Sequence, residues 1–204
     1  MTAAMKTDTA CALIHAARGD AIVVSTMTAM KAMDAIAPGA PLGLSSVPLM
    51  GGCAGLGLGL AMAQPDRQVL VLDGDASLLM ELGVLATVAA VQPRKYVHFV
   101  FANGVQFNGN GNLRLPAGTQ QVDFVSMGRA AGYAYAVRCA SESELQAVLS
   151  AAKAWTGPAL VELRIEADAP ALGPGAPGPE QPDKRFERMG NEARAMMAQL
   201  GTTF

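Results

Sequence analysis

The sequence predicts an α/β fold, in which a doubly wound parallel sheet carries helices on both faces. Short aliphatic and β-branched runs alternate along the chain with longer segments of helical character. This alternation favours a parallel sheet, because each connection between parallel strands crosses one face of the sheet and covers it.

Five apolar runs are expected to form the strands. Each run is short, and strands that are buried on both faces have continuous apolar sequences. The expected strands are Ala21–Val24, Val69–Leu72, Tyr96–Phe101, Tyr133–Val137 and Ala159–Ile165.

Helices are expected between these strands. Pro38 follows the first helix closely, and Pro93 ends the longest one. Ser141 precedes Glu144 by three residues, which fits a capping box at a helix start. The expected helices are Thr28–Ile36, Leu60–Ala63 after the Gly-rich segment Gly51–Gly59, Ser77–Val91, Val122–Ala131 and Ser141–Trp155.

The character of the chain changes after Glu166, which predicts a domain over residues 1–166 and a separate tail over residues 167–204. Ala167–Pro182 holds five prolines and three glycines, which the interior of a helix or strand would not tolerate. We expect an extended connector there. A terminal helix is expected over Phe186–Leu200, although Gly190 interrupts its helical spacing.

Composition favours a protein with a large subunit interface. Hydrophobic residues make up 51% of the chain, and charged residues 16%, against roughly 25% in average soluble proteins. A generous core is the alternative explanation for the apolar surplus, which includes 12 methionines. The net charge is −2 and the sequence shows no basic patch, so nucleic acid is not an expected partner.

The cysteines and the N-terminal sequence favour a cytoplasmic protein. Cys11, Cys53 and Cys139 are odd in number and lack metal-ligand spacing, which suits reduced thiols. No signal peptide is recognised at the N-terminus. The longest apolar stretch, Leu56–Ala63, is too short to cross a bilayer, so no membrane contact is expected.

Polar residues with ligand chemistry follow two expected strands. Asp73-Gly74-Asp75 ends the strand Val69–Leu72 and leads into a helix, and Asn103-Gly104 follows the next strand. Ligands bind at the carboxyl ends of strands in such sheets, and carboxylate and amide oxygens suit Mg²⁺. A helix start beside them would favour a diphosphate, and Gly74 is expected to allow a sharp turn. Taken singly, each motif is also typical of an ordinary turn.

These residues resemble a family signature. Gly74-Asp75-Ala76-Ser77 through Asn103 is similar to the Gly-Asp-Gly…Asn-Asn motif of thiamine-diphosphate-dependent enzymes. The resemblance covers residues 20–166, including Leu49-Met50-Gly51-Gly52, and is strongest to the β subunit of sulfopyruvate decarboxylase and the matching half of phosphonopyruvate decarboxylase. It implies that residues 1–166 form the domain that binds the diphosphate of the cofactor.

The resemblance also implies roles for individual residues. The carboxylate of Asp75, the side-chain oxygen of Asn103 and the backbone carbonyl of Val105 would bind Mg²⁺. Gly74, Ala76 and Ser77 would contact the diphosphate, and Met50 would support the bent shape of thiamine. The chain departs from the motif at Ala76 and Ala102, where Gly and Asn are usual; a methyl group at position 76 requires an ordinary φ angle.

The segment between Gln106 and Asn112 has two possible roles. Its three asparagines would recognise substrate, or they would form a flexible polar turn. Arg114 follows the segment and is either a surface residue or a partner for an anionic group of the substrate.

Several other residues are expected to be structural. The glycines of Gly55–Gly59 lack the spacing of a dinucleotide fingerprint and favour close helix packing instead. His98 lies within a strand and is expected to be buried or paired, His15 lies on an N-terminal helix, and Cys53 is expected to fill space in the core.

A partner subunit is expected, because the resemblance implies an activating glutamate that belongs to a different, pyrimidine-binding domain. The acidic residues Glu81, Glu142 and Glu144 fall on expected helices, and the sequence leaves no room for that domain. The chain would then be one subunit of a hetero-oligomeric decarboxylase of a small 2-oxo acid, with the thiazolium as electron sink. A carboligase subunit of the acetolactate-synthase kind and a non-catalytic cofactor-binding module are the alternatives.

Overall fold

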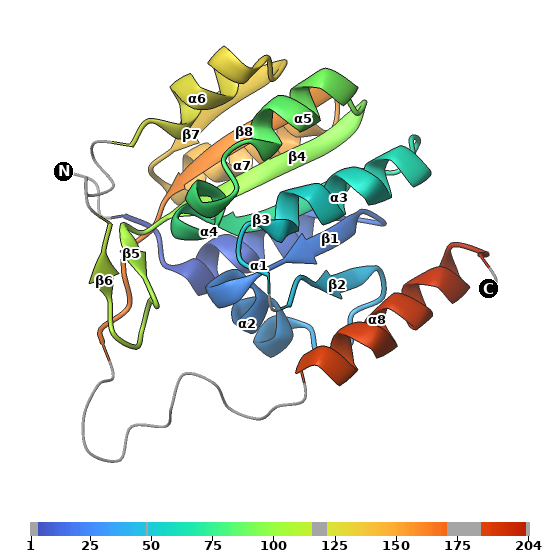
Figure 1. Ribbon diagram of the computed structural model, residues 1–204, viewed down its shortest axis with the longest axis horizontal. Helices are drawn as coiled ribbons and strands as arrows, with labels where there is room; N and C mark the ends of the chain where they lie inside the picture. The colour runs from blue at the N-terminus through green and yellow to red at the C-terminus, as the bar shows by residue number, and fades with distance from the viewer. Residues whose placement is uncertain (1–3, 48, 116–121, 171–184, 203–204) are drawn as a thin grey trace.

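A six-stranded, wholly parallel sheet forms the centre of the computed structural model, which describes residues 4–47, 49–115, 122–170 and 185–202. The order of its strands is β2-β1-β3-β4-β8-β7 (Figure 1). The α/β prediction is therefore confirmed. The strands are β1 (Ile22–Ser25), β2 (Gly43–Ser45), β3 (Val69–Gly74), β4 (Lys95–Ala102), β7 (Tyr135–Cys139) and β8 (Gly157–Arg164).

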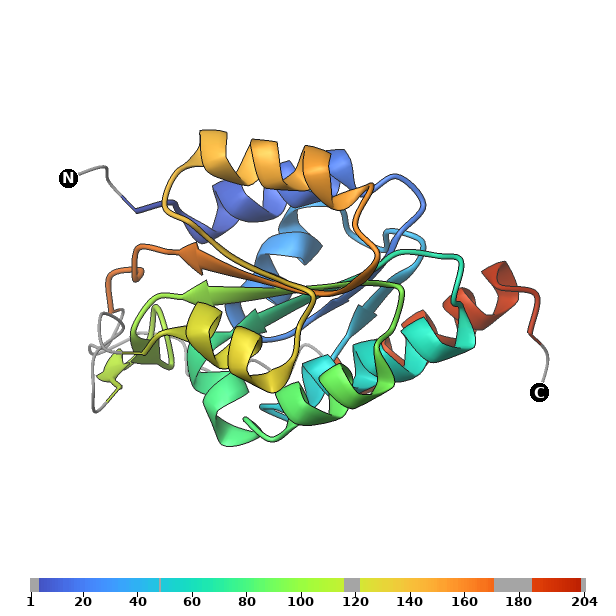
Figure 2. The ribbon, with the colours of Figure 1, turned by 90° about the horizontal axis from the view of Figure 1, so that it is seen from above.

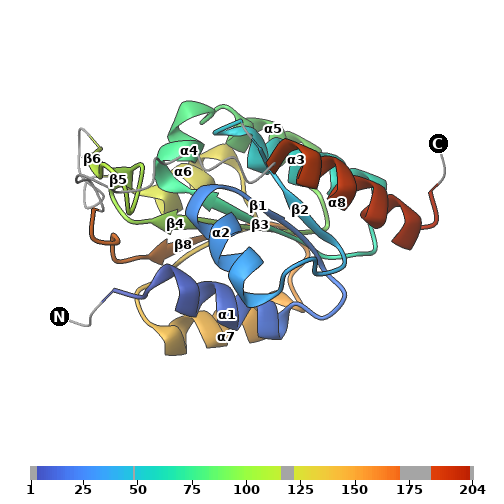
Figure 3. The ribbon, with the colours of Figure 1, turned by 90° about the horizontal axis from the view of Figure 1, so that it is seen from below.

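Helices cover both faces of the sheet, as Figure 2 shows from above. One face carries α1 (Thr7–Ala17), α2 (Met27–Ile36) and α7 (Glu142–Ala152), which Figure 3 shows from below. The other carries α3 (Gly52–Ala63), α4 (Asp75–Met80), α5 (Val84–Val91) and α6 (Phe124–Ala131). Alternate residues of the strands divide between two cores, so that Leu70 and Leu72 face the first group while Val69 and Val71 face the second.

The capping box predicted at the start of α7 is present. The backbone N–H of Glu144 donates to Oγ of Ser141 at 3.3 Å, and the Glu144 carboxylate accepts from the N–H of Ala140 at 2.7 Å. The first bond satisfies a backbone donor of the first helical turn, and the second closes the box at Ala140, one residue before the N-cap Ser141.

The single helix predicted over Ser77–Val91 is wrong, because the chain forms α4 and α5 with a turn between them. Glu81 ends α4, and Gly83 precedes α5. The side chain of Glu81 packs over Gly51, where an added Cβ would lie 2.2 Å from Cγ of Glu81. This tertiary contact holds α4 at the carboxyl edge of the sheet, while α5 runs back along its face.

The helix expected over Leu60–Ala63 begins at Gly52 and so includes most of the Gly-rich segment, while other predicted boundaries differ by a few residues. The strand expected at Tyr133–Val137 lies at Tyr135–Cys139, and the helix expected to run to Trp155 ends at Ala152. The short edge strand β2 and the hairpin of β5 (Val105–Gln106) and β6 (Leu113–Arg114) were not predicted. Such short strands carry too few residues to produce a periodic pattern.

The C-terminal helix α8 (Arg185–Gln199) packs beside the edge strand β2, in agreement with the expected terminal helix. Glu192 accepts hydrogen bonds from the backbone N–H of Ser45 at 2.7 Å and from its hydroxyl at 3.1 Å, and Arg188 pairs with Asp34 at 2.7 Å. These contacts cover an exposed sheet edge. The expected connector lies largely outside the described residues, and the division at residue 166 stays a prediction.

None of the helices formed by the described residues combines the length and the apolar character needed to span a membrane.

Candidate functional site

The predicted ligands Asp75 and Asn103 lie at the ends of two adjacent strands. β3 and β4 pair in parallel, with Gly74 opposite Phe101, so that both chains leave the sheet at the same edge. Asp75 is the first residue of α4, and Asn103 follows β4. Figure 1 shows α4 and the β5–β6 hairpin together at this edge. The sequence prediction that the two motifs meet is therefore confirmed.

The carboxylate of Asp75 joins the two strand ends directly. One oxygen, Oδ2, accepts a hydrogen bond from the backbone N–H of Gly104 at 2.7 Å, and Oδ1 accepts from the N–H of Ala76, also at 2.7 Å. The residue is 1% exposed. Its burial raises the pKa of the Asp75 carboxyl to about 6, against the lowering effect of these backbone donors. A cation beside it would compensate the loss of solvation.

Asn103 lies half-buried beside this carboxylate. Its side-chain oxygen accepts a hydrogen bond from the backbone N–H of Val105 at 3.0 Å. Gly104 lies between Asn103 and Val105 and has φ of +78°, a conformation that a residue without a side chain adopts most easily. This tight turn brings the side chain of Asn103 next to Val105, the first residue of β5.

The donor atoms here suit a hard divalent cation. One carboxylate, one amide oxygen and backbone carbonyls are oxygen ligands of the kind that Mg²⁺ takes together with phosphate and water. In the described part of the chain, no cluster of three or more His, Cys, Asp and Glu side chains is placed to hold a metal ion. The predicted Mg²⁺ ligands do not form such a cluster, because two of the three are an amide oxygen and a backbone oxygen.

The segment that carries Met50 is fastened to α4. The backbone N–H of Gly51 donates to Oγ of Ser77 at 2.8 Å, and Gly51 itself has φ of +90°. Ser77 is buried, and Met50 is half-buried on the approach to α3. The structure therefore brings Met50, Ser77 and Asp75 to the same edge of the sheet.

The sharp turn predicted at Gly74 is wrong. Gly74 has φ of −91° and ψ of 154°, an extended conformation open to any residue, and an added Cβ would meet Ser77 Cβ at an ordinary 3.8 Å. No sharp turn therefore requires glycine at this position. The condition for a methyl group at Ala76 is met, because Ala76 lies within α4 and has no positive φ.

Beneath the site, Asp73 of β3 and His98 of β4 are buried next to each other, and among the described residues Asp73 Oδ2 and His98 Nε2 have no hydrogen-bond partner. Asp73 Oδ1 accepts from the N–H of Gly74 at 2.9 Å, and Asp73 Oδ2 lies 3.5 Å from Nε2 of His98. His98 Nδ1 lies 3.4 Å from the hydroxyl of Tyr133, and His98 is fully buried, as predicted. Cys53 is also fully buried, and burial raises the pKa of its thiol well above the usual range, which confirms a space-filling role.

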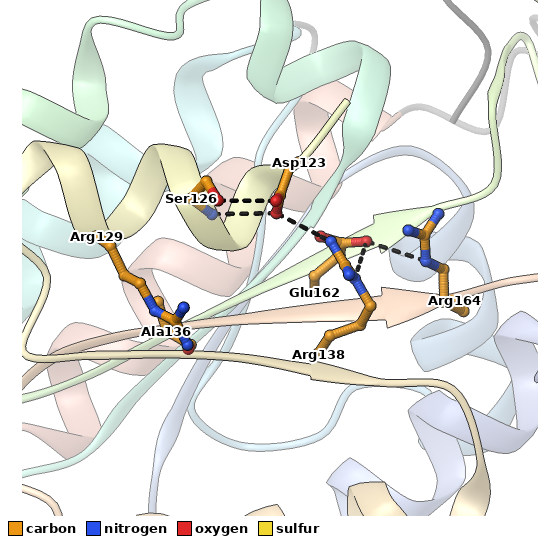
Figure 4. A network of polar contacts seen from close by, with 7 residues as sticks. All are labelled: Asp123, Ser126, Arg129, Ala136, Arg138, Glu162 and Arg164. Carbon is orange, nitrogen blue, oxygen red and sulfur yellow. Dashed lines mark hydrogen bonds and ion pairs between the residues drawn. The ribbon is translucent and has the colours of Figure 1, made fainter. Parts of the chain in front are cut away.

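A charged cluster that was not predicted lies on the neighbouring strands (Figure 4). Glu162, fully buried on β8, accepts from Arg138 Nε at 2.9 Å and pairs with Arg164 Nε at 3.1 Å. Arg138 also reaches Asp123, the N-cap residue of α6, at 2.9 Å. Arg164 lies opposite Ala102, so the cluster ties α6, β7 and β8 to the strand that precedes Asn103. A glutamate within an apolar strand was the available sequence signal.

The segment Gln106–Asn112 connects the two strands of the β5–β6 hairpin, and Arg114 is exposed on β6. Gly104 closes the base of this hairpin, because its carbonyl accepts from the N–H of Leu115 at 3.0 Å. The hairpin therefore begins at the predicted metal ligands. The side chains of Asn108 and Asn112 both donate to Asp168, and Asn112 also accepts from the N–H of Gly109.

A separate cavity of about 780 Å³ lies between α8 and β2 and includes none of the predicted ligands. Its charged residues Asp34, Arg188 and Glu192 form the contacts that hold α8 to the body of the protein. It is therefore distinct from the edge that carries Asp75.

Comparisons with known proteins point to one family. Residues 21–163 match the model of the thiamine pyrophosphate enzyme, C-terminal TPP binding domain. The chain is 39% identical over 147 residues to a phosphonopyruvate decarboxylase of Streptomyces hygroscopicus, covering 72% of this chain and 36% of that protein. It is 38% identical over 69 residues to the β subunit of sulfopyruvate decarboxylase of Methanocaldococcus jannaschii, covering 34% of this chain and 36% of that protein.

The fold is also shared with solved structures. A thiamin diphosphate-dependent enzyme from Mycobacterium smegmatis, described as putative, superposes with a TM-score of 0.68 at 23% identity. The match covers 82% of this chain and 33% of that one. The chain thus spans about a third of the length of these relatives.

Proposed function

Since the chain belongs to the thiamine pyrophosphate enzyme family, we propose that it is the diphosphate- and Mg²⁺-binding subunit of a decarboxylase that acts on a small 2-oxo acid. The observation that carries this proposal is the buried Asp75 carboxylate, which bonds to Gly104 and so joins the tips of β3 and β4 beside Asn103. Thiamine diphosphate, when bound, supplies the electron sink for loss of CO₂.

Each predicted residue has a part in this proposal. Asp75, Asn103 and the backbone carbonyl of Val105 bind Mg²⁺, and their clustering around Gly104 supports it. The diphosphate lies against Gly74, Ala76 and Ser77 at the start of α4, and Met50 supports the thiamine rings.

We further propose that the active site is shared with a pyrimidine-binding partner, which supplies the activating glutamate. The β subunit of sulfopyruvate decarboxylase among the relatives supports this division. Four large apolar side chains close to the site edge are at least half exposed, which favours a protein contact there. They are Leu49, Met80, Phe107 and Leu113.

A cytoplasmic location completes the proposal. All three cysteines are free and buried, which suits a reducing compartment.

The test is to purify the full chain alone and together with a pyrimidine-binding partner, and to assay both with a panel of 2-oxo acids, thiamine diphosphate and Mg²⁺. We expect CO₂ and an aldehyde from the mixture only. Turnover by the isolated chain would contradict the shared site.

Product analysis of the same mixture separates the alternatives. A carboligase would release a hydroxy-ketone product from two carbonyl substrates. A non-catalytic module would bind cofactor in the mixture without any turnover.

A further inference from the structure

The tip of the β5–β6 hairpin is fastened to the segment that follows β8. Asn108 Nδ2 donates to Oδ2 of Asp168 at 2.7 Å, and the backbone N–H of Asp168 donates back to Asn108 Oδ1 at 2.8 Å. Asn112 Nδ2 donates to the carbonyl of Asp168 at 2.6 Å. Asn108, Asn112 and Asp168 are named here the hairpin latch. Residues 56 to 60 positions apart in the sequence thus meet through three hydrogen bonds.

The other bonds at the hairpin tip are short-range ones, in which the backbone N–H groups of Asn110 and Asn112 donate to the carbonyl of Phe107 at 3.0 and 3.2 Å. Only two residue pairs join β5 to β6, and an isolated hairpin of this size is marginal in water. Phe107 and Asn112 have positive φ angles of 57° and 44°, and such conformations persist only where neighbouring contacts impose them. The latch provides contacts of this kind, because Asn112 also accepts from the N–H of Gly109 at 2.8 Å.

The position of the hairpin bears directly on the site. Its first residue, Val105, donates to the side-chain oxygen of Asn103, and Gly104 donates to Asp75. A hairpin that moved about its base would carry the Val105 carbonyl away from these two side chains. The sequence analysis gave two possible roles for these asparagines, substrate recognition or a flexible polar turn. Holding the hairpin in position is a third.

We propose that Asn108 and Asp168 are positioning residues, which hold the hairpin so that Val105 and Asn103 keep the geometry of the Mg²⁺ site. This inference rests on the proposed function of that site. In this role the latch acts through the backbone of residues 103–105 and needs no contact with the cofactor or the substrate.

The test is a charge exchange across the latch in the full chain. Asn108→Asp replaces a donor with a second carboxylate facing Asp168, which turns a hydrogen bond into a repulsion. The double variant Asn108→Asp/Asp168→Asn restores one donor and one acceptor in reversed order. Asn191→Asp is the matched control, because Asn191 lies on α8 and bonds Arg194 within that helix.

Calorimetric titration of thiamine diphosphate with saturating Mg²⁺, into each variant mixed with the pyrimidine-binding partner, is the first measurement. We expect Asn108→Asp to weaken binding about fivefold, the factor that corresponds to the net free energy of one ordinary hydrogen bond, and the double variant to regain most of this loss. Asn191→Asp should bind as the parent chain does.

Amide hydrogen exchange without cofactor is the second measurement. Asn108→Asp should speed exchange at Val105 and Leu115, whose N–H groups close the base of the hairpin, and the double variant should slow it again. Unchanged affinity in Asn108→Asp, or failure of the double variant to recover, would overturn the inference. Absence of Mg²⁺-dependent binding in the mixture of the parent chain and its pyrimidine-binding partner would overturn the proposed function, and the inference with it.

Discussion

Asp75→Asn is expected to reduce the Mg²⁺-dependent affinity for thiamine diphosphate by about 100-fold or more, since loss of groups that merely orient metal ligands already costs 10–100-fold. The substitution removes the charge that attracts the cation and keeps one of the two acceptor oxygens for Gly104 or Ala76. Titration calorimetry at fixed Mg²⁺ concentration measures the change. Asp75→Ala should have the same effect on affinity and also lower stability, because it leaves two buried N–H groups unpaired.

Asp20→Asn is the control for loss of a carboxylate. Asp20 pairs with Arg67 on the surface, and its side chain is 87% exposed. This variant should bind cofactor as the parent chain does, because exposed ion pairs contribute little. Binding by Asp75→Asn that matched the parent chain would remove Asp75 from the metal site.

Gly57→Ala is expected to lower the free energy of unfolding by about 2 kcal/mol, the usual cost of an extra methyl group in a packed core. The added Cβ would lie 2.3 Å from Cγ2 of Val71 and 3.5 Å from Cε2 of Tyr96. Both neighbours are buried side chains of the sheet, so α3 would have to move away from β3. Urea denaturation of the two chains measures the difference.

Gly59→Ala is the matched control on the same helix. An added Cβ at position 59 would meet nothing within 4 Å. Because alanine favours helix over glycine by up to about 1 kcal/mol, this variant should be as stable as the parent chain or more so. Equal stability of Gly57→Ala and Gly59→Ala would mean that α3 does not depend on a close approach to the sheet.

The contrast between Gly57 and Gly59 also refines the interpretation of the segment Gly55–Gly59 that was made from the sequence. Small residues for close packing were expected throughout the segment, but only Gly57 faces the sheet closely. Gly55 and Gly59 are exposed. The pattern of glycines predicts a packed helix, and its orientation decides which glycine is required.

Local sequence determined the main strands and the edge of the sheet at which the predicted ligands lie. The β-branched runs around Val71 and Phe99 can bury both faces only within a covered parallel sheet, and polar residues directly after them must gather where the strands end. For this reason Asp75 and Asn103 were identifiable from the sequence, and the structure places them side by side.

Tertiary structure alone decided the contacts between distant segments. The break between α4 and α5 depends on Glu81 packing over Gly51, the cluster around Glu162 on three separate elements, and the hairpin latch on Asn108 meeting Asp168. Hydrogen bonds and ion pairs of this kind form wherever folding brings partners within reach. The residues involved carry no periodic pattern, because their interactions depend on distances in space and not on spacing along the chain.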